Sequence, residues 1–198
     1  MSAAEQATPA TDVVEARLLA AFPDVSLEHD ARSGELTIVL APEALADVAR
    51  FLRDDSELRF ARLSDLCGVD NLHLGRERRF AVAYHLHSLL LHRWVRIRVD
   101  LDEDEPVVPS VVAIWPAANW PERETFDLYG IQFAGHPALE RLLLPDDWEG
   151  HPLRKDYPFQ PEAVEFSANV DRVNAGKVQR RPDWKPWRTD SAPRGTGR

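Results

Sequence analysis

Residues 121–158 read PERETFDLYGIQFAGHPALERLLLPDDWEGHPLRKDYP, one connected stretch of paired charges, aromatic residues and turn residues. Pro121 in a first turn and Gly130 at a C-terminal end predict a complete short helix between them. The residues after this helix predict an extended arm, because prolines and glycines recur along them: Gly135, Pro137, Pro145, Gly150, Pro152 and Pro158. We expect such a path to lie on another surface, because it cannot satisfy its backbone polar groups within its own domain.

Successive residues of a helix turn by about 100°, which divides the predicted helix into two faces. Arg123 and Asp127 share a face and stand four residues apart, a spacing at which an ion pair contributes only about 0.2 to 0.5 kcal/mol. Glu122 falls on the aromatic face with Phe126 and Tyr129. A carboxylate buried there needs a partner, so Glu122 caps the helix N-terminus, meets an arginine, or faces another chain.

The spaced residues of this stretch resemble the signature region of the thirty-kilodalton subunit family of proton-pumping NADH:quinone oxidoreductase, respiratory complex I. The helix contributes Glu122, Arg123, Glu124, Asp127, Gly130 and Ile131 to the resemblance. The arm contributes His136, Pro137, Arg141, Leu142, Leu143, Asp147, Trp148, Gly150, Pro152, Arg154, Lys155, Asp156, Tyr157 and Pro158.

The resemblance implies a peripheral-arm subunit with no active site, flavin or iron–sulfur cluster of its own. It implies partners that form the quinone site and hold the terminal iron–sulfur cluster, with FMN and the clusters in partner subunits. As partner-interface residues we predict Glu122, Arg123, Glu124, Asp127, Arg141, Trp148, Arg154, Lys155, Asp156 and Tyr157. The electron donor stays open, because related subunits occur in membrane-bound hydrogenases and chloroplast-type dehydrogenases.

Composition is consistent with a peripheral protein. No apolar run approaches the ~18 residues that span a bilayer, and a net charge of -9 argues against nucleic acid as a partner. Cys67 is the only cysteine, so the chain cannot form an internal disulfide or supply the roughly four thiolates of a cluster. No transit peptide is visible, and the composition is rich in Ala and Arg. We therefore expect a bacterial chain that lies at the cytoplasmic face of the inner membrane.

The rest of the pattern predicts an α+β fold: a two-layer domain with a mixed or antiparallel sheet and flanking helices, followed by a long extended C-terminal arm. The expected helices cover 13–22 and 42–53, and the expected strands cover 25–30, 35–40, 58–69, 80–87 and 91–101, with an ambiguous segment at 111–115. Residues 35–40 form a hairpin with 25–30, and 91–101 a long antiparallel pair with 80–87.

We divide the chain into a flexible N-terminus (1–11), an α+β domain that ends in the signature helix (12–133), and a partner-binding arm with a basic tail (134–198). Residues 176–198 hold seven basic residues against two acidic ones, a net charge of +5. Trp184 and Trp187 are possible anchors of this tail on a partner.

Other candidate sites have plain structural explanations. His85, His87 and His92 suggest a metal site, but a polar strand face supplies the same pattern. Arg96 and Arg98 share a face and could hold an anion or an acidic neighbour. Cys67 has no adjacent base, so we expect a small core hydrophobe. A free-standing metal-dependent hydrolase that uses His136, Asp147 and His151 is the alternative of a different class.

Overall fold

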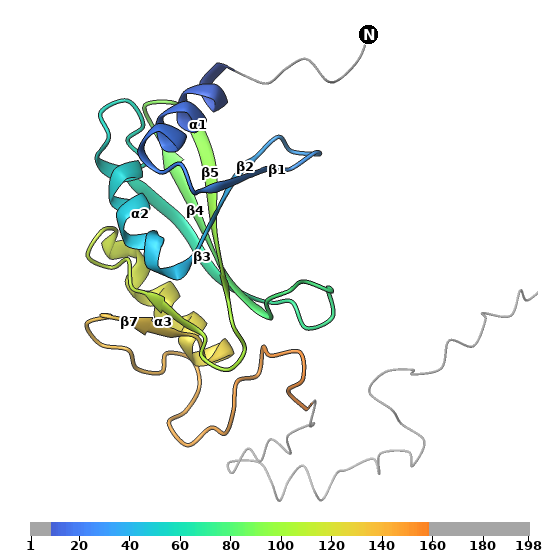
Figure 1. Cartoon of the computed structure of the whole chain (residues 1–198). Helices are drawn as coiled ribbons and strands as arrows, with labels where there is room; N and C mark the ends of the chain where they lie inside the picture. The colour runs from blue at the N-terminus through green and yellow to red at the C-terminus, as the bar shows by residue number, and fades with distance from the viewer. Residues whose placement is uncertain (1–8, 159–198) are drawn as a thin grey trace, which may run out of the picture. The chain divides into compact units, whose positions relative to one another are not determined.

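The computed structural model describes residues 9–158, so residues 1–8 of the predicted flexible N-terminus (1–11) and the predicted basic tail lie outside the described residues. Residues 9–11 belong to the first helix. One five-stranded sheet forms the centre, in the order β1-β2-β5-β4-β3 (Figure 1). Its strands are β1 (Ser26–His29), β2 (Leu36–Leu40), β3 (Arg62–Asp70), β4 (Phe80–Ser88) and β5 (Arg93–Leu101). The predicted hairpin and the predicted long antiparallel pair are both confirmed. Strands β2 and β5 run parallel, which makes the sheet mixed.

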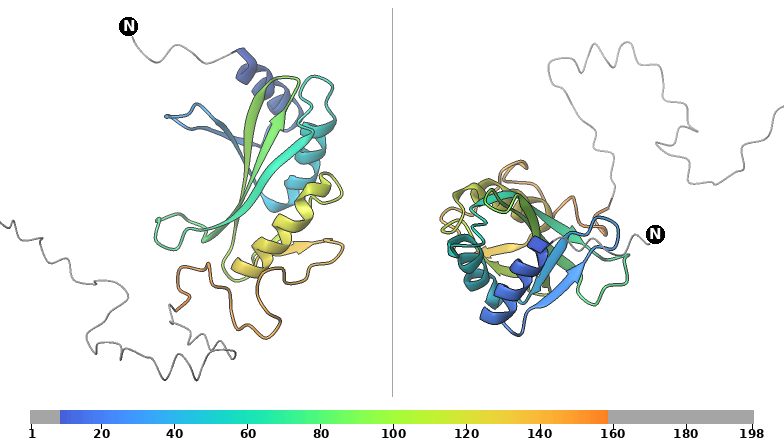
Figure 2. Two further views of the ribbon diagram at one scale, coloured as in Figure 1. Left: turned by 180° about the vertical axis from the view of Figure 1, so that it is seen from behind. Right: turned by 90° about the horizontal axis from the view of Figure 1, so that it is seen from above.

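Three helices cover one face of the sheet, and the opposite face carries no helix among the described residues (Figures 1 and 2). They are α1 (Pro9–Ala21), α2 (Leu45–Asp54) and α3 (Asn119–Tyr129). The predicted apolar stripe of α2 is buried at Leu45, Val48, Ala49 and Leu52. Because side chains alternate along a strand, Tyr84 and Ile97 point into the core while Arg96 and Arg98 lie on the open face.

The open face is polar, and its arginines form ion pairs with nearby glutamates. Arg98 donates to Glu28 at 2.8 and 2.9 Å, and Arg96 pairs with Glu35. Of the two ligands that we considered for these arginines, an anion or an acidic neighbour, the structure shows the acidic neighbour: Glu28 in β1 and Glu35 just before β2. Cys67 also lies on this face and is exposed, so its predicted place in the core is wrong. Strand alternation explains the difference, because Leu66 points inward and Cys67 consequently points outward.

Short elements place α3 beside the main sheet. Strand β6 (Val107–Pro109) pairs in parallel with β7 (Gln132–Ala134), which follows α3 directly. The ambiguous segment 111–115 forms turns that lead into a 3-10 helix, Pro116–Ala118, while Pro42–Ala44 forms a second one before α2. Helix α3 packs tightly on β3 at Gly68, where an added Cβ atom would stand 2.8 Å from Tyr129 and 2.9 Å from Thr125. Within residues 9–158, no helix is both long and apolar enough to cross a bilayer.

Candidate functional site

Helix α3, the signature helix, lies between the sheet and the arm. Glu122 and Thr125 are buried on the sheet side, whereas Asp127 is fully buried on the opposite side, beneath the arm. Gly130 ends the helix with φ 74°, in the left-handed region that favours glycine. An added Cβ atom there would come within 2.5 Å of the His151 side chain, so close packing of the arm also requires glycine.

Asp127 organises the middle of the arm. One of its oxygens accepts the backbone N–H groups of three consecutive leucines, Leu142, Leu143 and Leu144, at 3.0, 2.8 and 2.9 Å. Its other oxygen accepts a bond from Arg141 at 3.0 Å. Burial by itself would raise the pKa of Asp127, but the three N–H donors and Arg141 outweigh it and hold the pKa below its ordinary value. The carboxylate is therefore charged, and both of its oxygens are hydrogen-bonded within the chain.

Arg123 does not pair with Asp127, although the four-residue spacing allowed it. Its guanidinium donates instead to the backbone carbonyls of Glu140 at 3.1 Å and Arg141 at 3.0 Å. The two residues thus lie one turn apart on the same face of α3, and both bind the same segment of the arm. We attribute the difference to the arm, which offers each side chain several bonds where the isolated pair offers one.

The arm also caps the C-terminal end of α3. The last carbonyl groups of a helix have no partner within the helix. Here the arm supplies partners: His151 Nδ1 lies 2.8 Å from the carbonyl oxygen of Asp127, Leu153 donates its N–H to Leu128, and Arg154 donates to Tyr129 at 2.7 Å. The expectation that this path cannot satisfy its polar groups within its own domain is therefore wrong for these residues.

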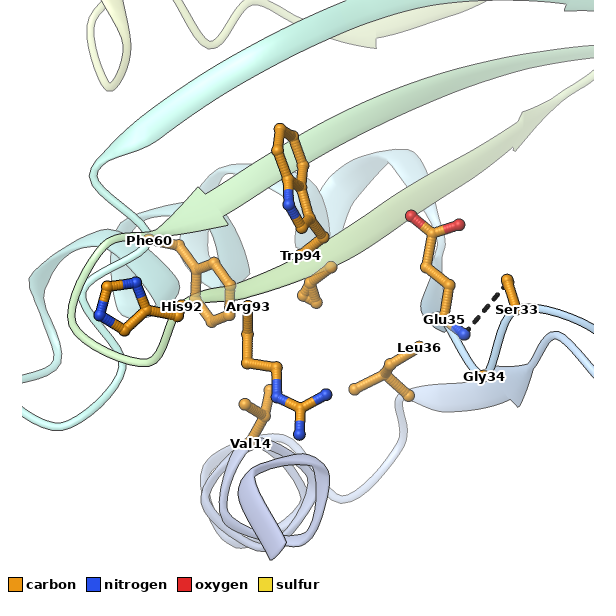
Figure 3. A pocket seen from close by; sticks show the side chains of 10 residues that line it. Val14, Ser33, Gly34, Glu35, Leu36, Phe60, His92, Arg93 and Trp94 are labelled. Carbon is orange, nitrogen blue, oxygen red and sulfur yellow. Dashed lines mark hydrogen bonds between the residues drawn. The ribbon is translucent and has the colours of Figure 1, made fainter. Parts of the chain in front are cut away.

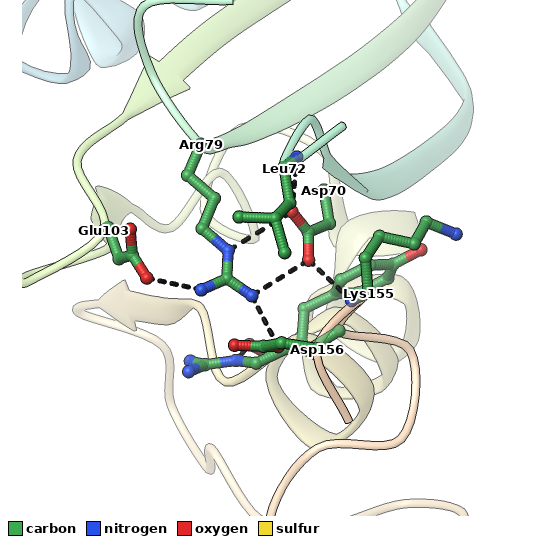
Figure 4. Close-up of polar contacts among 8 residues, drawn as sticks. Asp70, Leu72, Arg79, Glu103, Lys155 and Asp156 are labelled. Carbon is green, nitrogen blue, oxygen red and sulfur yellow. Dashed lines mark hydrogen bonds and ion pairs between the residues drawn. The ribbon is translucent and has the colours of Figure 1, made fainter. Parts of the chain in front are cut away.

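The end of the arm is held by a buried arginine, Arg79, shown in Figure 4. Arg79 donates to Asp70 at 3.2 and 3.3 Å, to Asp156 of the arm at 2.6 Å, and to Glu103. The backbone N–H of Lys155 donates to Asp70 at 2.8 Å. The bond from Arg79 holds the pKa of Asp156 below its ordinary value. Sequence reasoning missed Arg79 and Asp70, because their partners lie far along the chain. Asp156 is 77 positions from Arg79, and Lys155 is 85 positions from Asp70.

Glu122 has partners other than the three that we considered. Its carboxylate accepts bonds from the Ser110 hydroxyl at 2.6 Å and from the Val111 N–H at 2.7 Å, and the residue is fully buried. Burial raises the pKa of Glu122 to about 7, and the two hydrogen bonds only partly oppose this rise. The His136 side chain, also buried, places Nε2 4.0 Å from the same carboxylate. The segment before α3 therefore closes over a carboxyl group that titrates near neutral pH.

The other predicted interface residues differ in exposure. Glu124, Lys155 and Asp156 are exposed, whereas Trp148 and Tyr157 are half-buried. The Tyr157 hydroxyl donates to the carbonyl of Glu149 at 3.1 Å. The side chains that reach outward from α3 and the arm include large apolar ones: Trp120, Leu143 and Leu153 are 67%, 61% and 43% exposed.

The two histidines of the hydrolase alternative form hydrogen bonds between and within α3 and the arm. His136 Nε2 lies 3.2 Å from the carbonyl oxygen of Asn119 and its Nδ1 accepts the N–H of Ala138, while His151 contacts the Asp127 carbonyl. No three His, Cys, Asp or Glu side chains converge on a possible metal position among residues 9–158. The same result covers the His85, His87 and His92 group, in which His87 stacks on Trp94 with ring centres 4.5 Å apart.

A pocket of about 360 Å³ opens beside α1 (Figure 3). Helix α1 lies at the opposite end of the sheet from the arm (Figure 1). Val14, Leu36 and Phe60 supply apolar walls, and Arg93 and Trp94 stand at its side. Glu35, which also lines it, is engaged by Arg96. The pocket is separate from the signature helix and its arm.

Comparison with known proteins places this arrangement in a family. The family "Respiratory-chain NADH dehydrogenase, 30 Kd subunit" matches residues 38–163. The chain is 55% identical over 161 residues to the NADH-quinone oxidoreductase C subunit of Roseiflexus sp. (strain RS-1), covering 81% of this chain and 91% of the relative. It is 43% identical over 164 residues to the equivalent protein of Herpetosiphon aurantiacus, covering 83% of this chain and 94% of the relative.

Two solved structures resemble this fold. The trypsin-resistant fragment (1-134) of Nqo5 matches with a TM-score of 0.55 and 32% identity, over 66% of this chain and 99% of that chain. A chain of the membrane-bound sulfane sulfur reductase, an archaeal respiratory membrane complex, matches with a TM-score of 0.64 and 22% identity, over 89% and 96%. The second match shows a shared fold alone. The family match and the close relatives show that the chain belongs to the 30 kDa subunit family of respiratory-chain NADH dehydrogenase.

Proposed function

We propose that the chain is a non-catalytic scaffold in the peripheral arm of a proton-translocating NADH:quinone oxidoreductase. It binds the subunit that forms the quinone site and the subunit that holds the terminal iron–sulfur cluster, and so fixes their separation for electron transfer. FMN and the clusters belong to partner subunits. The assembly lies at the cytoplasmic face of a bacterial inner membrane, and this chain is peripheral to that membrane.

One observation carries the proposal: the signature residues are used to fix the shape of the arm. Asp127 and Arg123 together bond five consecutive residues of the arm, from Glu140 to Leu144. The cost of burying the Asp127 carboxylate is offset only because it is fully hydrogen-bonded. A chain that uses buried charge to hold one conformation of an extended segment presents that segment as a rigid surface.

The outward face of the arm has the composition of a binding surface. Leu143 and Leu153 stay exposed although the backbone beneath them is fixed, and Trp120 lies exposed at the start of α3. Large apolar and aromatic side chains on a pre-organised surface supply most of the free energy of protein–protein association. We therefore assign this face to the contact with the partner subunits.

The test is a co-purification from the native membrane. The chain is tagged at its N-terminus, the membranes are solubilised gently, and the eluate is examined for co-purifying subunits and for NADH:quinone reduction. Recovery of flavin, iron–sulfur and membrane subunits with that activity supports the scaffold. A lone chain with stoichiometric bound metal would contradict it and favour the hydrolase. Recovery of a hydrogenase instead would assign the chain to that related complex.

A further inference from the structure

The loop between β3 and β4 projects beyond the sheet and carries exposed leucines (Figures 1 and 2). Leu74 is 68% exposed and Leu72 is 38% exposed. The loop is nevertheless ordered by its own bonds: Asn71 donates its N–H to Arg79 at 2.7 Å, and Leu74 donates to Asn71 at 2.8 Å. Fixing a backbone costs about 1 to 2 kcal/mol per residue in conformational entropy, and these exposed leucines offset little of that cost through contacts with residues 9–158.

One carboxylate joins this loop to the end of the arm. The two oxygens of Asp70 accept the backbone N–H groups of Leu72, at 3.0 Å, and of Lys155, at 2.8 Å. Arg79, at the end of the loop, bonds both Asp70 and Asp156. The loop and the arm therefore form one continuous surface around this buried pair (Figure 4), which we call the loop–arm surface: residues 71–76 and 153–156.

The buried pair fixes geometry more than it adds stability. Asp70 is fully buried and Arg79 is 7% exposed, and replacing such a pair by apolar residues is often neutral for stability. The pair fixes the position of Leu72 in the loop relative to Lys155 in the arm, because Asp70 accepts the backbone N–H of both residues. Figure 4 shows the Lys155 side chain pointing away from Arg79 and its carboxylates. Lys155 is exposed and has no carboxylate partner among residues 9–158.

The charges around the loop–arm surface select the kind of partner. Asp102, Glu103 and Asp156 are 68%, 57% and 52% exposed, and all three are tied to the arginines at the end of the loop. Residues 70–79, 102–105 and 153–156 together hold seven acidic and five basic residues, a net charge of -2 that does not attract anionic lipid headgroups. A protein surface can place a carboxylate opposite Lys155 and an apolar pocket opposite the leucines while it avoids the acidic side chains.

We infer that the loop–arm surface is a docking site for a partner polypeptide, whose apolar pocket receives Leu74 and whose carboxylate pairs with Lys155. This inference rests on the proposed scaffold function and adds the β3–β4 loop to the binding surface. Leu74 is the anchor because it is the most exposed leucine of the surface, on a loop whose conformation is already fixed.

The experiment compares Leu74→Ser with Leu89→Ser in the full-length tagged chain, purified from gently solubilised membranes. Leu89 is the matched control, because it is 66% exposed in the turn after β4, at the opposite end of that strand. We expect L74S to recover about tenfold less partner subunit per tagged chain, the loss that corresponds to about 1.4 kcal/mol. L89S should recover the wild-type amount. Equal recovery with both variants would overturn the inference.

A second pair of variants keeps the test independent of any loss of folding. Lys155→Glu is compared with Arg62→Glu, an exposed charge at the opposite end of β3. K155E should lower recovery, more strongly at low salt than at high salt, whereas R62E should not. If K155E behaves like R62E at both salt concentrations, the proposed carboxylate contact is wrong.

Two further readouts separate the possible failures. Vesicles that contain anionic lipid are floated with the wild-type chain and with L74S. If L74S lowers only vesicle binding and leaves subunit recovery unchanged, the surface binds lipid and the inference is overturned. Wild-type recovery and NADH:quinone reduction test the scaffold function itself. A wild-type chain that recovers no partner contradicts both, whereas normal recovery with every variant contradicts only the docking site.

Discussion

The carboxylate of Asp127 accepts the backbone N–H of Leu143 at 2.8 Å, across 16 positions of sequence. The same oxygen accepts the two neighbouring N–H groups, so one side chain of α3 fixes a whole turn of the arm. Helix and arm therefore form one structural unit, and changes in α3 are expected to act on the arm.

Asp127→Asn should destabilise the chain by about 2 to 4 kcal/mol, because hydrogen bonds to a charged group contribute about 1.5 to 3 kcal/mol each and several are affected. An asparagine has only one acceptor oxygen, so its amide NH₂ must face either the leucine N–H groups or Arg141. The measurement is urea unfolding together with hydrogen exchange of the amides at 142–144, which should exchange faster.

Asp147→Asn is the matched control for this variant. Asp147 lies in the same arm, is exposed, and makes no side-chain bond among the described residues. Its variant should leave both the unfolding free energy and the exchange of 142–144 unchanged. A similar exchange pattern in both variants would refute the role of Asp127 in ordering the arm.

Arg79→Ala should cost about 3 to 5 kcal/mol of unfolding free energy, because it leaves the fully buried Asp70 without its partner. The neighbouring Arg78→Ala is the control: Arg78 is 45% exposed and pairs with an exposed Asp102, and such surface pairs contribute at most about 1 kcal/mol. Thermal unfolding of both variants measures the difference. Comparable midpoints for the two would show that the buried pair is not needed for folding.

Stability should also depend on pH through Glu122. Its pKa is about 7 in the folded chain against an ordinary value of 4.5, so the folded state binds the proton more tightly than the unfolded state. The free energy of unfolding therefore falls as pH rises from 4.5 to 7, and the loss is complete above pH 7. At 1.36 kcal/mol per pKa unit, the loss is on the order of 3 kcal/mol.

Urea unfolding at about pH 5 and about pH 8, on either side of the folded pKa, tests this dependence. Glu122→Gln should flatten the fall between the two pH values, because the amide does not ionise. Glu124→Gln, two residues away and exposed, should keep the wild-type fall. An unchanged fall in E122Q would show that another group titrates over this range.

Much of the fold followed from local periodicity. Alternation along β4 and β5 predicted both strands, and the apolar stripe of α2 predicted that helix, because each pattern repeats with the period of its own element. The parallel pairing of β2 with β5 could not be predicted in this way. Strand patterns define which face is buried, but they do not define which strand is the neighbour.

The site was predictable in part for the same reason. Gly130, a local signal, predicted the end of α3, and Pro121 lies in its first turn, which begins two residues earlier at Asn119. The partners of the charged residues were not predictable, because Asp127 meets the arm and Asp70 meets Lys155 over 85 positions of chain. A buried carboxylate indicates that it needs a partner, and only the folded chain shows which one it has.

Gly130→Ala should weaken the junction between α3 and the arm for two separate reasons. A φ of 74° strains any residue with a Cβ atom, and that atom would stand 2.5 Å from His151 and 2.7 Å from Arg154. Gly34→Ala isolates the first cause, because Gly34 has φ 70° with no atom within 4 Å of its added Cβ. We expect about 1 kcal/mol of destabilisation for G34A and clearly more for G130A, measured by thermal unfolding.

Hydrogen exchange at Leu153 and Arg154 should accelerate only in G130A, because only there does the added methyl group displace the residues that cap the helix. Equal destabilisation of the two variants, with unchanged exchange at 153–154, would mean that the arm yields to the methyl group without loosening.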